Sequence, residues 1–140
     1  MSQGRRRLLV TAGALVALTF FVAAAAASEL DEGPVRVDIR IHHSRYIPSQ
    51  LSVPVGRPIR FVFHNEDPIE HEWIVGDATV HDGHRTGTEP HHGSRPTEVS
   101  IPALGTVTTL VTFRTAASLT YVCHLPGHEA YGMVGTLDIR

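Results

Sequence analysis

The sequence predicts an all-β fold: an antiparallel β-sandwich or barrel of about seven or eight strands. Apolar and polar residues alternate in short runs, glycine and proline turns separate these runs, and no convincing helical stretch lies between them. The 140 residues are enough for one domain with a single core, and no repeat or linker divides them.

The predicted strands follow one another along the chain. Alternation is clearest in residues 35–41, where valine or isoleucine occupies every second position, and a second alternating run at 51–55 ends in a Gly-Arg-Pro turn. The later runs are rich in β-branched and aromatic residues: 59–63, 73–75, 97–101, 106–113, 119–123 and 134–139. The long stretch Asp77–Pro96 is expected to be an irregular loop, and loops of that length are usually functional or disordered.

Residues 1–27 are predicted to be an export signal. Three arginines precede the uncharged apolar run Leu8–Val22, and Ala23–Ala27 offers an Ala-x-Ala cleavage site. The alternative is an uncleaved anchor, because the 20 residues 8–27 are long enough to span a bilayer, and only then would the protein contact a membrane. We expect an exported domain, residues 28–140, that is periplasmic, extracellular or associated with the cell envelope.

The charged residues and the cysteine count exclude several classes of function. The expected exported domain has nine arginines against 14 acidic residues, a net charge of −5, so we expect no nucleic-acid partner. One cysteine excludes an internal disulfide framework and a four-cysteine metal cluster. In an oxidising compartment this thiol must be buried or bound.

The cysteine stands in a spacing typical of copper ligands. Cys123, His128 and Met133 form a Cys-x4-His-x4-Met array between the last two predicted strands. Thiolate and imidazole suit copper, with the thioether as a weak axial ligand. A second imidazole has to come from elsewhere, and we favour His71 over His64 because a strand follows His71 immediately.

At this point the sequence resembles the cupredoxins, the blue-copper family that includes plastocyanin and azurin. The resemblance rests on Tyr46-x-Pro48-x-x-Leu51-x-Val53-x-x-Gly56, on Phe61-x-Phe63-x-Asn65 followed by His71, and on the array Cys123, His128 and Met133. It implies a Greek-key β-sandwich with one type 1 copper held by these four ligands, Met133 being axial. It also implies that Asn65 links the two ligand loops by hydrogen bonds.

The resemblance implies electron transfer rather than catalysis. Four protein ligands leave no open position for a small-molecule substrate, so we expect outer-sphere one-electron transfer and no enzyme activity. In the family the histidine equivalent to His128 is the electron port. A redox partner protein is therefore expected to dock near His128, on a patch formed by Leu125, Pro126, Ala130 and Tyr131.

His124 raises an enzymatic alternative. The segment from Cys123 to Met133 matches the Cys-His-x3-His-x4-Met pattern of multicopper oxidases. The pattern of those enzymes has a further histidine directly before the cysteine, whereas this chain has Val122 there. We therefore expect His124 not to be a ligand.

A second group of histidines leaves the function open. The stretch Asp77–Pro96 contains a candidate Cu(II) or Zn(II) site made of His81, His84, Glu89, His91 and His92, and His42 and His43 are further candidates. The alternative is a solvated loop that binds nothing. A second metal ion would favour copper tolerance, storage or delivery over electron transfer alone.

Overall fold

The computed structural model describes residues 33–87, 92 and 95–140. Within them, Pro34–Arg140 form one compact unit. The predicted export signal, residues 1–27, lies outside the described residues, so its cleavage stays a prediction. No helix in the described ranges is long and apolar enough to cross a membrane.

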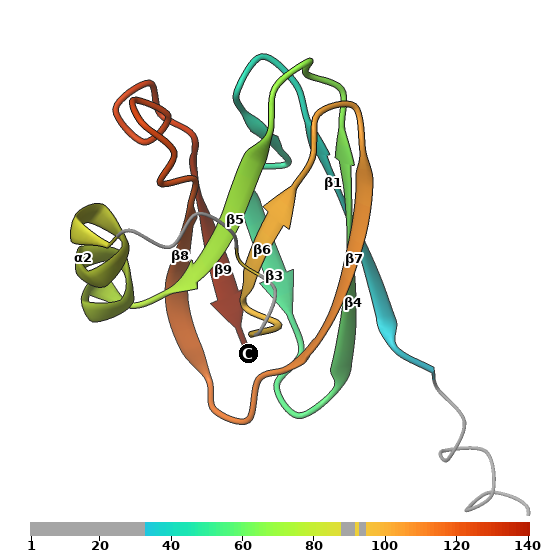
Figure 1. Cartoon of the computed structure of the whole chain (residues 1–140). Coiled ribbons are helices and arrows are strands. Elements are labelled where there is room, and N and C mark those ends of the chain that lie inside the picture. Colours follow the sequence, from blue (N-terminus) through green and yellow to red (C-terminus); the bar gives the residue numbers. More distant parts are fainter. Residues whose placement is uncertain (1–32, 88–91, 93–94) are drawn as a thin grey trace, which may run out of the picture. The chain divides into compact units, whose positions relative to one another are not determined.

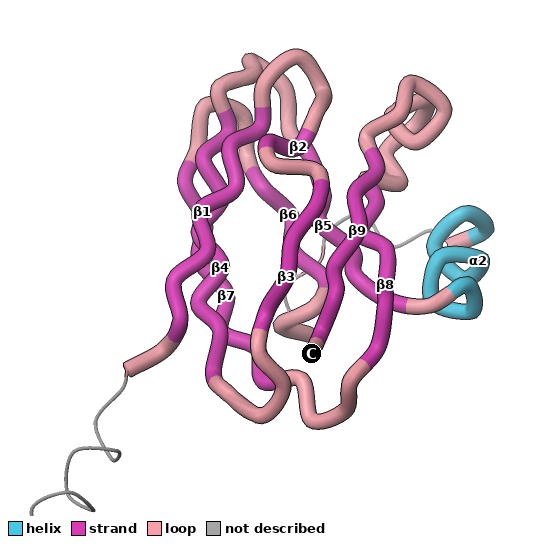
Figure 2. Tube along the Cα trace, turned by 180° about the vertical axis from the view of Figure 1, so that it is seen from behind, coloured by secondary structure: helices cyan, strands magenta, loops and turns pink. Residues whose placement is uncertain are grey.

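The unit is a sandwich of two β-sheets, which confirms the predicted all-β sandwich (Figure 1). One sheet has four strands in the order β2-β1-β4-β7, formed by Tyr46–Ile47, Val35–Ile41, Pro58–Asn65 and Thr106–Thr112. The other has five strands in the order β3-β9-β8-β5-β6, formed by Gln50–Val53, Val134–Ile139, Ala117–Val122, His71–Gly76 and Glu98–Ile101. The view from behind shows β3, β9 and β8 side by side in the second sheet (Figure 2).

Two strand pairs differ from the antiparallel prediction. Strand β1 pairs with β4 in parallel, from Val35 opposite Ile59 to Ile41 opposite Asn65, and β3 pairs with β9 in parallel. The other strand pairs among the described residues are antiparallel. Between β1 and β4 the chain passes through β3 of the opposite sheet, so β4 returns in the direction of β1. A sequence pattern of period two carries no information on this choice.

The core lies between the sheets and is centred on Trp73, whose side chain is fully buried. Its ring centroid lies 4.9 Å from that of Phe61 and 5.1 Å from that of Phe63, which come from the opposite sheet. Alternation along β4 and β5 points these rings inward. Each buried large apolar side chain contributes about 1.5–3 kcal/mol to folding. Cys123 and Met133 belong to the same core, so the ligand region is continuous with it.

The prediction that no helix interrupts the strands is wrong at one place. Helix α2 spans Ala78–Thr86, and the Asp77 side chain caps it by accepting the Val80 N–H at 3.1 Å. Propensity alone does not favour this helix, because it is short and contains β-branched residues and Gly83. Tertiary contacts stabilise it: His81 is buried, and Gly76 at the end of β5 lets Val80 approach closely.

Candidate metal centre

Three of the predicted copper ligands come together at one end of the sandwich. His71 begins β5, Cys123 follows β8, and His128 lies in the loop between β8 and β9, at the upper end of the molecule in Figure 1. His128 Nδ1 lies 3.2 Å from His71 Nδ1 and 3.2 Å from Cys123 Sγ. The donor atoms of all three lie within 4.8 Å of one another, as ligands of a single ion must.

A buried carboxylate orients His71. Asp67 Oδ2 lies 2.9 Å from His71 Nε2, and the same side chain accepts the backbone N–H groups of His43 and Ser44 at 2.7 and 2.8 Å. A carboxylate so placed favours the tautomer with the proton on Nε2, which leaves the Nδ1 lone pair facing Cys123 and His128. Burial opposes ionisation of Asp67, but these hydrogen bonds and His71 outweigh it and lower the pKa of Asp67.

Cys123 is fully buried and held from two sides. The Glu72 backbone N–H donates to its sulfur at 3.3 Å, and its own N–H donates to the Met133 carbonyl at 3.2 Å. Burial raises the pKa of the Cys123 thiol to about 11, while the N–H groups of Glu72 and Leu125 act in the opposite direction. A soft metal ion that displaces the thiol proton would therefore gain a ligand already in place.

The loop after Cys123 brings His128 and Met133 back to it through successive tight turns. His128 N donates to Leu125 O and Met133 N donates to His128 O, both at 3.0 Å. Gly127 and Gly132 have φ of +86° and +88°, a conformation that residues with a Cβ rarely adopt. Met133 is fully buried in the same core cluster as Cys123. Burial and the neighbouring His71 lower the pKa of His128, which favours its neutral, metal-binding form.

Asn65 does not make the contacts that the resemblance implied. Its side-chain amide donates to the carbonyls of Ile69 and Pro102 at 2.8 and 2.9 Å, and its oxygen accepts the Asp67 N–H at 3.0 Å. It thus fixes the loop before His71 against the β6–β7 turn, not against the Cys123 loop. The Glu72 N–H links the two ligand segments directly by donating to Cys123 Sγ.

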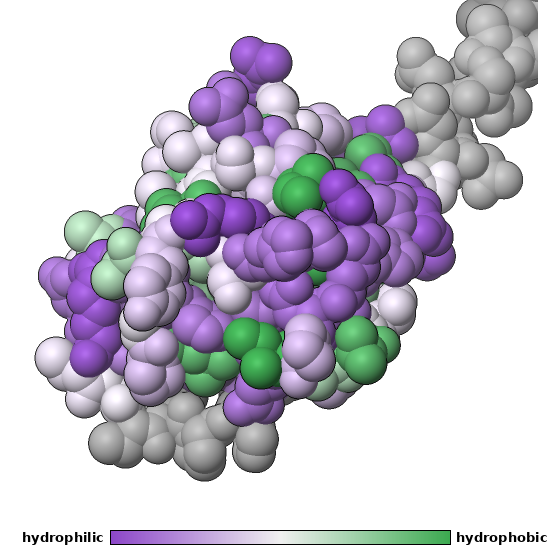
Figure 3. Space-filling model, turned by 90° about the horizontal axis from the view of Figure 1, so that it is seen from above, coloured by the Kyte–Doolittle hydropathy of each residue, from purple (hydrophilic) through white to green (hydrophobic). Residues whose placement is uncertain are grey.

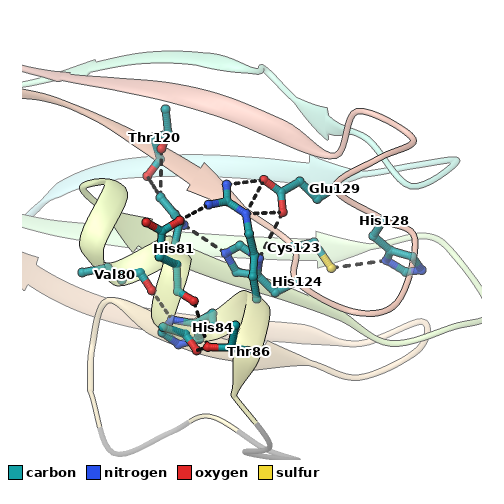
Figure 4. Close-up of polar contacts among 12 residues, drawn as sticks. Val80, His81, His84, Thr86, Thr120, Cys123, His124, His128 and Glu129 are labelled. Carbon is teal, nitrogen blue, oxygen red and sulfur yellow. Dashed lines mark hydrogen bonds and ion pairs between the residues drawn. The ribbon is translucent and has the colours of Figure 1, made fainter.

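Helix α2 packs against the Cys123 loop through polar contacts (Figure 4). His81 Nδ1 lies 3.0 Å from His124 Nε2, and Arg85 binds both oxygens of Glu129. His124 is outside the group formed by His71, Cys123 and His128. Burial lowers its pKa to about 4, so it is neutral at physiological pH. The helix therefore supports the loop that carries His128.

Of the second predicted cluster, the described residues come together only in part. The structure brings His84 and His92 together, and the third member of the group is Glu98 on β6, which sequence reasoning missed. His81 turns away to Thr120, with its Nε2 2.8 Å from the Thr120 hydroxyl. Glu89 and His91 lie outside the described residues. His42 and His43 are in neither group of potential ligands found among the described residues.

The end of the sandwich seen from above in Figure 3 is mostly polar, with separate apolar patches. The most exposed large apolar side chains of the unit include Tyr131 of the Cys123 loop, at 70%, and Leu104, at 71%. His128 is partly exposed, whereas Cys123 is buried. Of the three clustered donors, His128 thus gives the site its path to the surface.

Comparisons with known proteins agree with the fold described above. A family model described as a cupredoxin-like domain matches residues 12–117. The match includes His71 and ends before Cys123. Two curated proteins, both described as copper-resistant cuproprotein CopI, are similar: one from Rubrivivax gelatinosus, 31% identical over 100 residues, and one from Pseudomonas aeruginosa, 25% identical over 136 residues.

The aligned regions cover 69% of this chain and 60% of the Rubrivivax protein, and 74% of this chain and 75% of the Pseudomonas protein. Among solved structures, auracyanin B aligns with a TM-score of 0.64 at 21% identity over 79% of this chain and 93% of its own. Auracyanin from Roseiflexus castenholzii also gives 0.64, at 18% identity over 78% of this chain and 99% of its own. Rusticyanin gives 0.55, at 17% identity over 79% of this chain and 81% of its own. These structural similarities establish the sandwich fold.

Proposed function

The chain belongs to the cupredoxin-like family, and from this we propose that it is an exported type 1 copper protein that transfers single electrons by outer-sphere exchange. The observation that carries the proposal is the convergence of two imidazole nitrogens and one thiol sulfur at His71, His128 and Cys123. Two nitrogens and a sulfur, with Met133 as the weak axial donor, are the ligands of blue-copper electron-transfer sites.

The residues around the site suit that role. When bound, copper supplies the one-electron chemistry by cycling between Cu(I) and Cu(II). Asp67 orients His71, the Glu72 N–H stabilises the Cys123 thiolate, and the buried position of Cys123 limits access of water. Because the backbone already holds the donors together, little has to rearrange when the charge changes. We propose that the protein catalyses no reaction and takes no small-molecule substrate.

A redox partner protein is proposed to dock around His128. Its imidazole is partly exposed, and Leu125, Pro126, Ala130 and Tyr131 lie in the same loop. Transient electron-transfer encounters bury little surface, so a few exposed apolar side chains are enough for docking. We expect Tyr131→Glu to slow electron self-exchange, measured by NMR line broadening, while the visible spectrum is unchanged. An unchanged rate would contradict docking at this loop.

A second candidate function is copper tolerance, storage or delivery. It is favoured by the two relatives, both of which are described as copper-resistant cuproproteins. Export through residues 1–27 is compatible with both functions. In a strain that lacks the protein, loss of growth at raised copper, restored by the intact gene but not by Cys123→Ser, would support tolerance. Normal growth in copper together with a lost electron-transfer activity would support the shuttle.

Titration of the purified protein with Cu(II) tests the metal site. We expect one equivalent to produce an intense visible thiolate-to-copper band that Cys123→Ser abolishes. His71→Ala should also lose the band, whereas His64→Ala should keep it, because His64 lies on β4 beside Asp38, at 3.0 Å. A visible band retained by Cys123→Ser would refute the assignment.

A further inference from the structure

We propose a second metal site on the outer face of the five-stranded sheet, where His84, His92 and Glu98 bind one Cu(II) or Zn(II) ion. Their donor atoms lie within 4.8 Å of one another. This site goes beyond the function proposed above and shares no ligand with the site at Cys123. Of the set predicted from sequence, His84 and His92 contribute and the described residue His81 does not, while Glu89 and His91 lie outside the described residues.

Strand pairing places the carboxylates of this site. In the antiparallel pair β5–β6, Glu72 is opposite Ser100 and Ile74 is opposite Glu98. Side chains alternate along a strand, and Trp73 between them points into the core. Glu72 and Glu98 therefore both lie on the outer face, and each is only 6% exposed.

The two histidines reach this face from different segments. His84 comes from α2, and its neighbour His81 fixes the helix to Thr120 of β8. His92 follows α2, and its backbone N–H donates to the Ser100 hydroxyl at 2.9 Å. The two imidazole rings lie with their centroids 5.1 Å apart. The fold thus collects one strand residue and two residues from the connection between β5 and β6.

Hydrogen-bond chemistry determines which nitrogen of His84 is available. Nδ1 lies 2.8 Å from the Val80 carbonyl, a contact drawn as a dashed line in Figure 4. Because a carbonyl only accepts, Nδ1 carries the proton. The lone pair is then on Nε2, which lies 3.9 Å from Glu98 Oε2. Metal-binding histidines almost always have such an outer partner on the other ring nitrogen.

His92 shows the same arrangement with a carboxylate as its outer partner. Its Nε2 lies 3.4 Å from Glu72 Oε1, and its Nδ1 lies 3.9 Å from Glu98 Oε2. Both histidines therefore direct one nitrogen at the same oxygen of Glu98. Donors bound to one ion at about 2.1 Å in a tetrahedron are about 3.4 Å apart, so small side-chain rotations complete the site.

The charge of the site favours a cation. Glu72 and Glu98 bring two buried carboxylates together, and Arg95, whose side chain is 70% exposed, binds Glu98 through Oε1 at 3.0 Å. That contact leaves Oε2 directed at the two imidazoles. Buried carboxylates are stable when they are paired or bind a metal. Arg95 balances one of the two negative charges, and a divalent ion between Glu98, His84 and His92 would balance the other.

A cleft of about 790 Å³ gives an ion access to the site. His84, His92 and Glu98 line it together with His124 and with Leu125 of the Cys123 loop. Three protein donors and a solvent-accessible side form a site with an open coordination position. Two nitrogens and one oxygen, without sulfur, favour Cu(II) and Zn(II) over Cu(I), and Cu(II) is expected to bind more tightly.

Glu72 connects the two sites. Its backbone N–H donates to Cys123 Sγ at 3.3 Å, and its side chain contacts His92. A metal ion at the outer site would therefore fix the residue that also contacts the thiolate. The second site nevertheless has its own ligands, so its occupancy can be measured independently of the first.

The experiment uses the full chain with the first site already filled by one equivalent of copper, judged by saturation of the visible band. Calorimetric titration with Zn(II) should then show one further equivalent. We expect His84→Ala, His92→Ala and Glu98→Gln each to weaken this step at least about tenfold, with the visible band retained. Glu98→Gln keeps the side-chain shape and so guards against misfolding.

Asp82→Asn is the matched control, because Asp82 lies on the same helix as His84 but its exposed side chain binds Arg85 and not the proposed ligands. It should keep the second equivalent. Cys123→Ser should lose the visible band and still bind one Zn(II), which separates failure of this proposal from failure of the first site. Cu(II) should displace the bound Zn(II). Absence of a second equivalent, or a second equivalent unaffected by all three ligand substitutions, would overturn the proposal.

Discussion

Asp67 Oδ2 lies 2.9 Å from His71 Nε2, and the same carboxylate accepts two backbone N–H groups from the turn after β1. One side chain thus couples the position of a proposed copper ligand to a turn that is more than 20 residues earlier in the chain. The relationship explains how a fixed Nδ1 lone pair is available beside Cys123 before any metal binds.

Asp67→Asn is expected to weaken copper binding about 10- to 100-fold, because an amide cannot favour the same tautomer of His71 as strongly. It should also lower the free energy of unfolding by about 1–3 kcal/mol, since the three donors then compete for a single oxygen. Competition with a copper chelator and urea unfolding measure the two effects. Asp38→Asn, which alters an exposed carboxylate on β1, is the control and should not change copper affinity. Equal affinity in the Asp67 variant would show that Asp67 does not orient the ligand.

Asn65→Ala is expected to destabilise the metal-free protein by about 1–3 kcal/mol, because the carbonyls of Ile69 and Pro102 would lose their shared donor. Asn65→Asp should cost at least as much at pH 7, since its carboxylate would face those two carbonyls. Unfolding can be followed by the fluorescence of Trp73, the single tryptophan, which is fully buried. A fully stable Asn65→Asp variant would contradict the direction of these hydrogen bonds.

Glu129→Gln tests the contact between α2 and the Cys123 loop through its pH dependence. Hydrogen bonds from Arg85 lower the pKa of Glu129 in the folded protein. The ion pair therefore stabilises the fold fully above about pH 4.3, the pKa of glutamate in the unfolded chain. This stabilisation is lost as the pH falls through the lowered pKa of Glu129 in the folded protein. His124 also faces Glu129, but its pKa of about 4 keeps it neutral at pH 7, where the two proteins are first compared.

We therefore expect metal-free wild-type protein to be more stable than Glu129→Gln at pH 7, by less than about 1 kcal/mol because the pair is partly exposed. The difference should disappear on acidification and shrink in 1 M salt, where exposed charges are screened. Asp82→Asn, at the other contact of Arg85, is a control that leaves Glu129 paired. A difference that persists at acid pH would show that charge is not the cause.

Gly135→Ala is expected to destabilise the protein by about 1–3 kcal/mol through overpacking. A Cβ at this position of β9 would overlap the ring of Tyr121, which is fully buried and donates to the Pro48 carbonyl at 3.0 Å. Gly83→Ala is the matched comparison, because it lies in α2 with nothing near its Cβ position, and it should stabilise by about 0.5–1 kcal/mol. Thermal unfolding of both variants measures the two changes in stability. Equal changes in the two variants would show that packing at Gly135 is unimportant.

Much of the fold follows from local patterns. The alternation in 35–41 predicts a strand, and Val35–Ile41 is one. The spacing of Cys123, His128 and Met133 between two predicted strands already implies a shared loop, because neighbouring strands bring their connecting segment back on itself. Helix α2 was missed because its sequence has weak helix propensity, and contacts with distant residues such as Thr120 stabilise it.

The sequence by itself therefore determined the sandwich class and the order and chemistry of the proposed copper ligands, because these depend on side-chain alternation and short spacings. Tertiary structure alone decided the parallel β1–β4 pair, the partners of Asn65 and the meeting of His84 and His92 with Glu98. The physical reason is the same in each case. These contacts join segments that are distant in sequence, and strand pairing between distant segments decides which side chains share a face of a sheet.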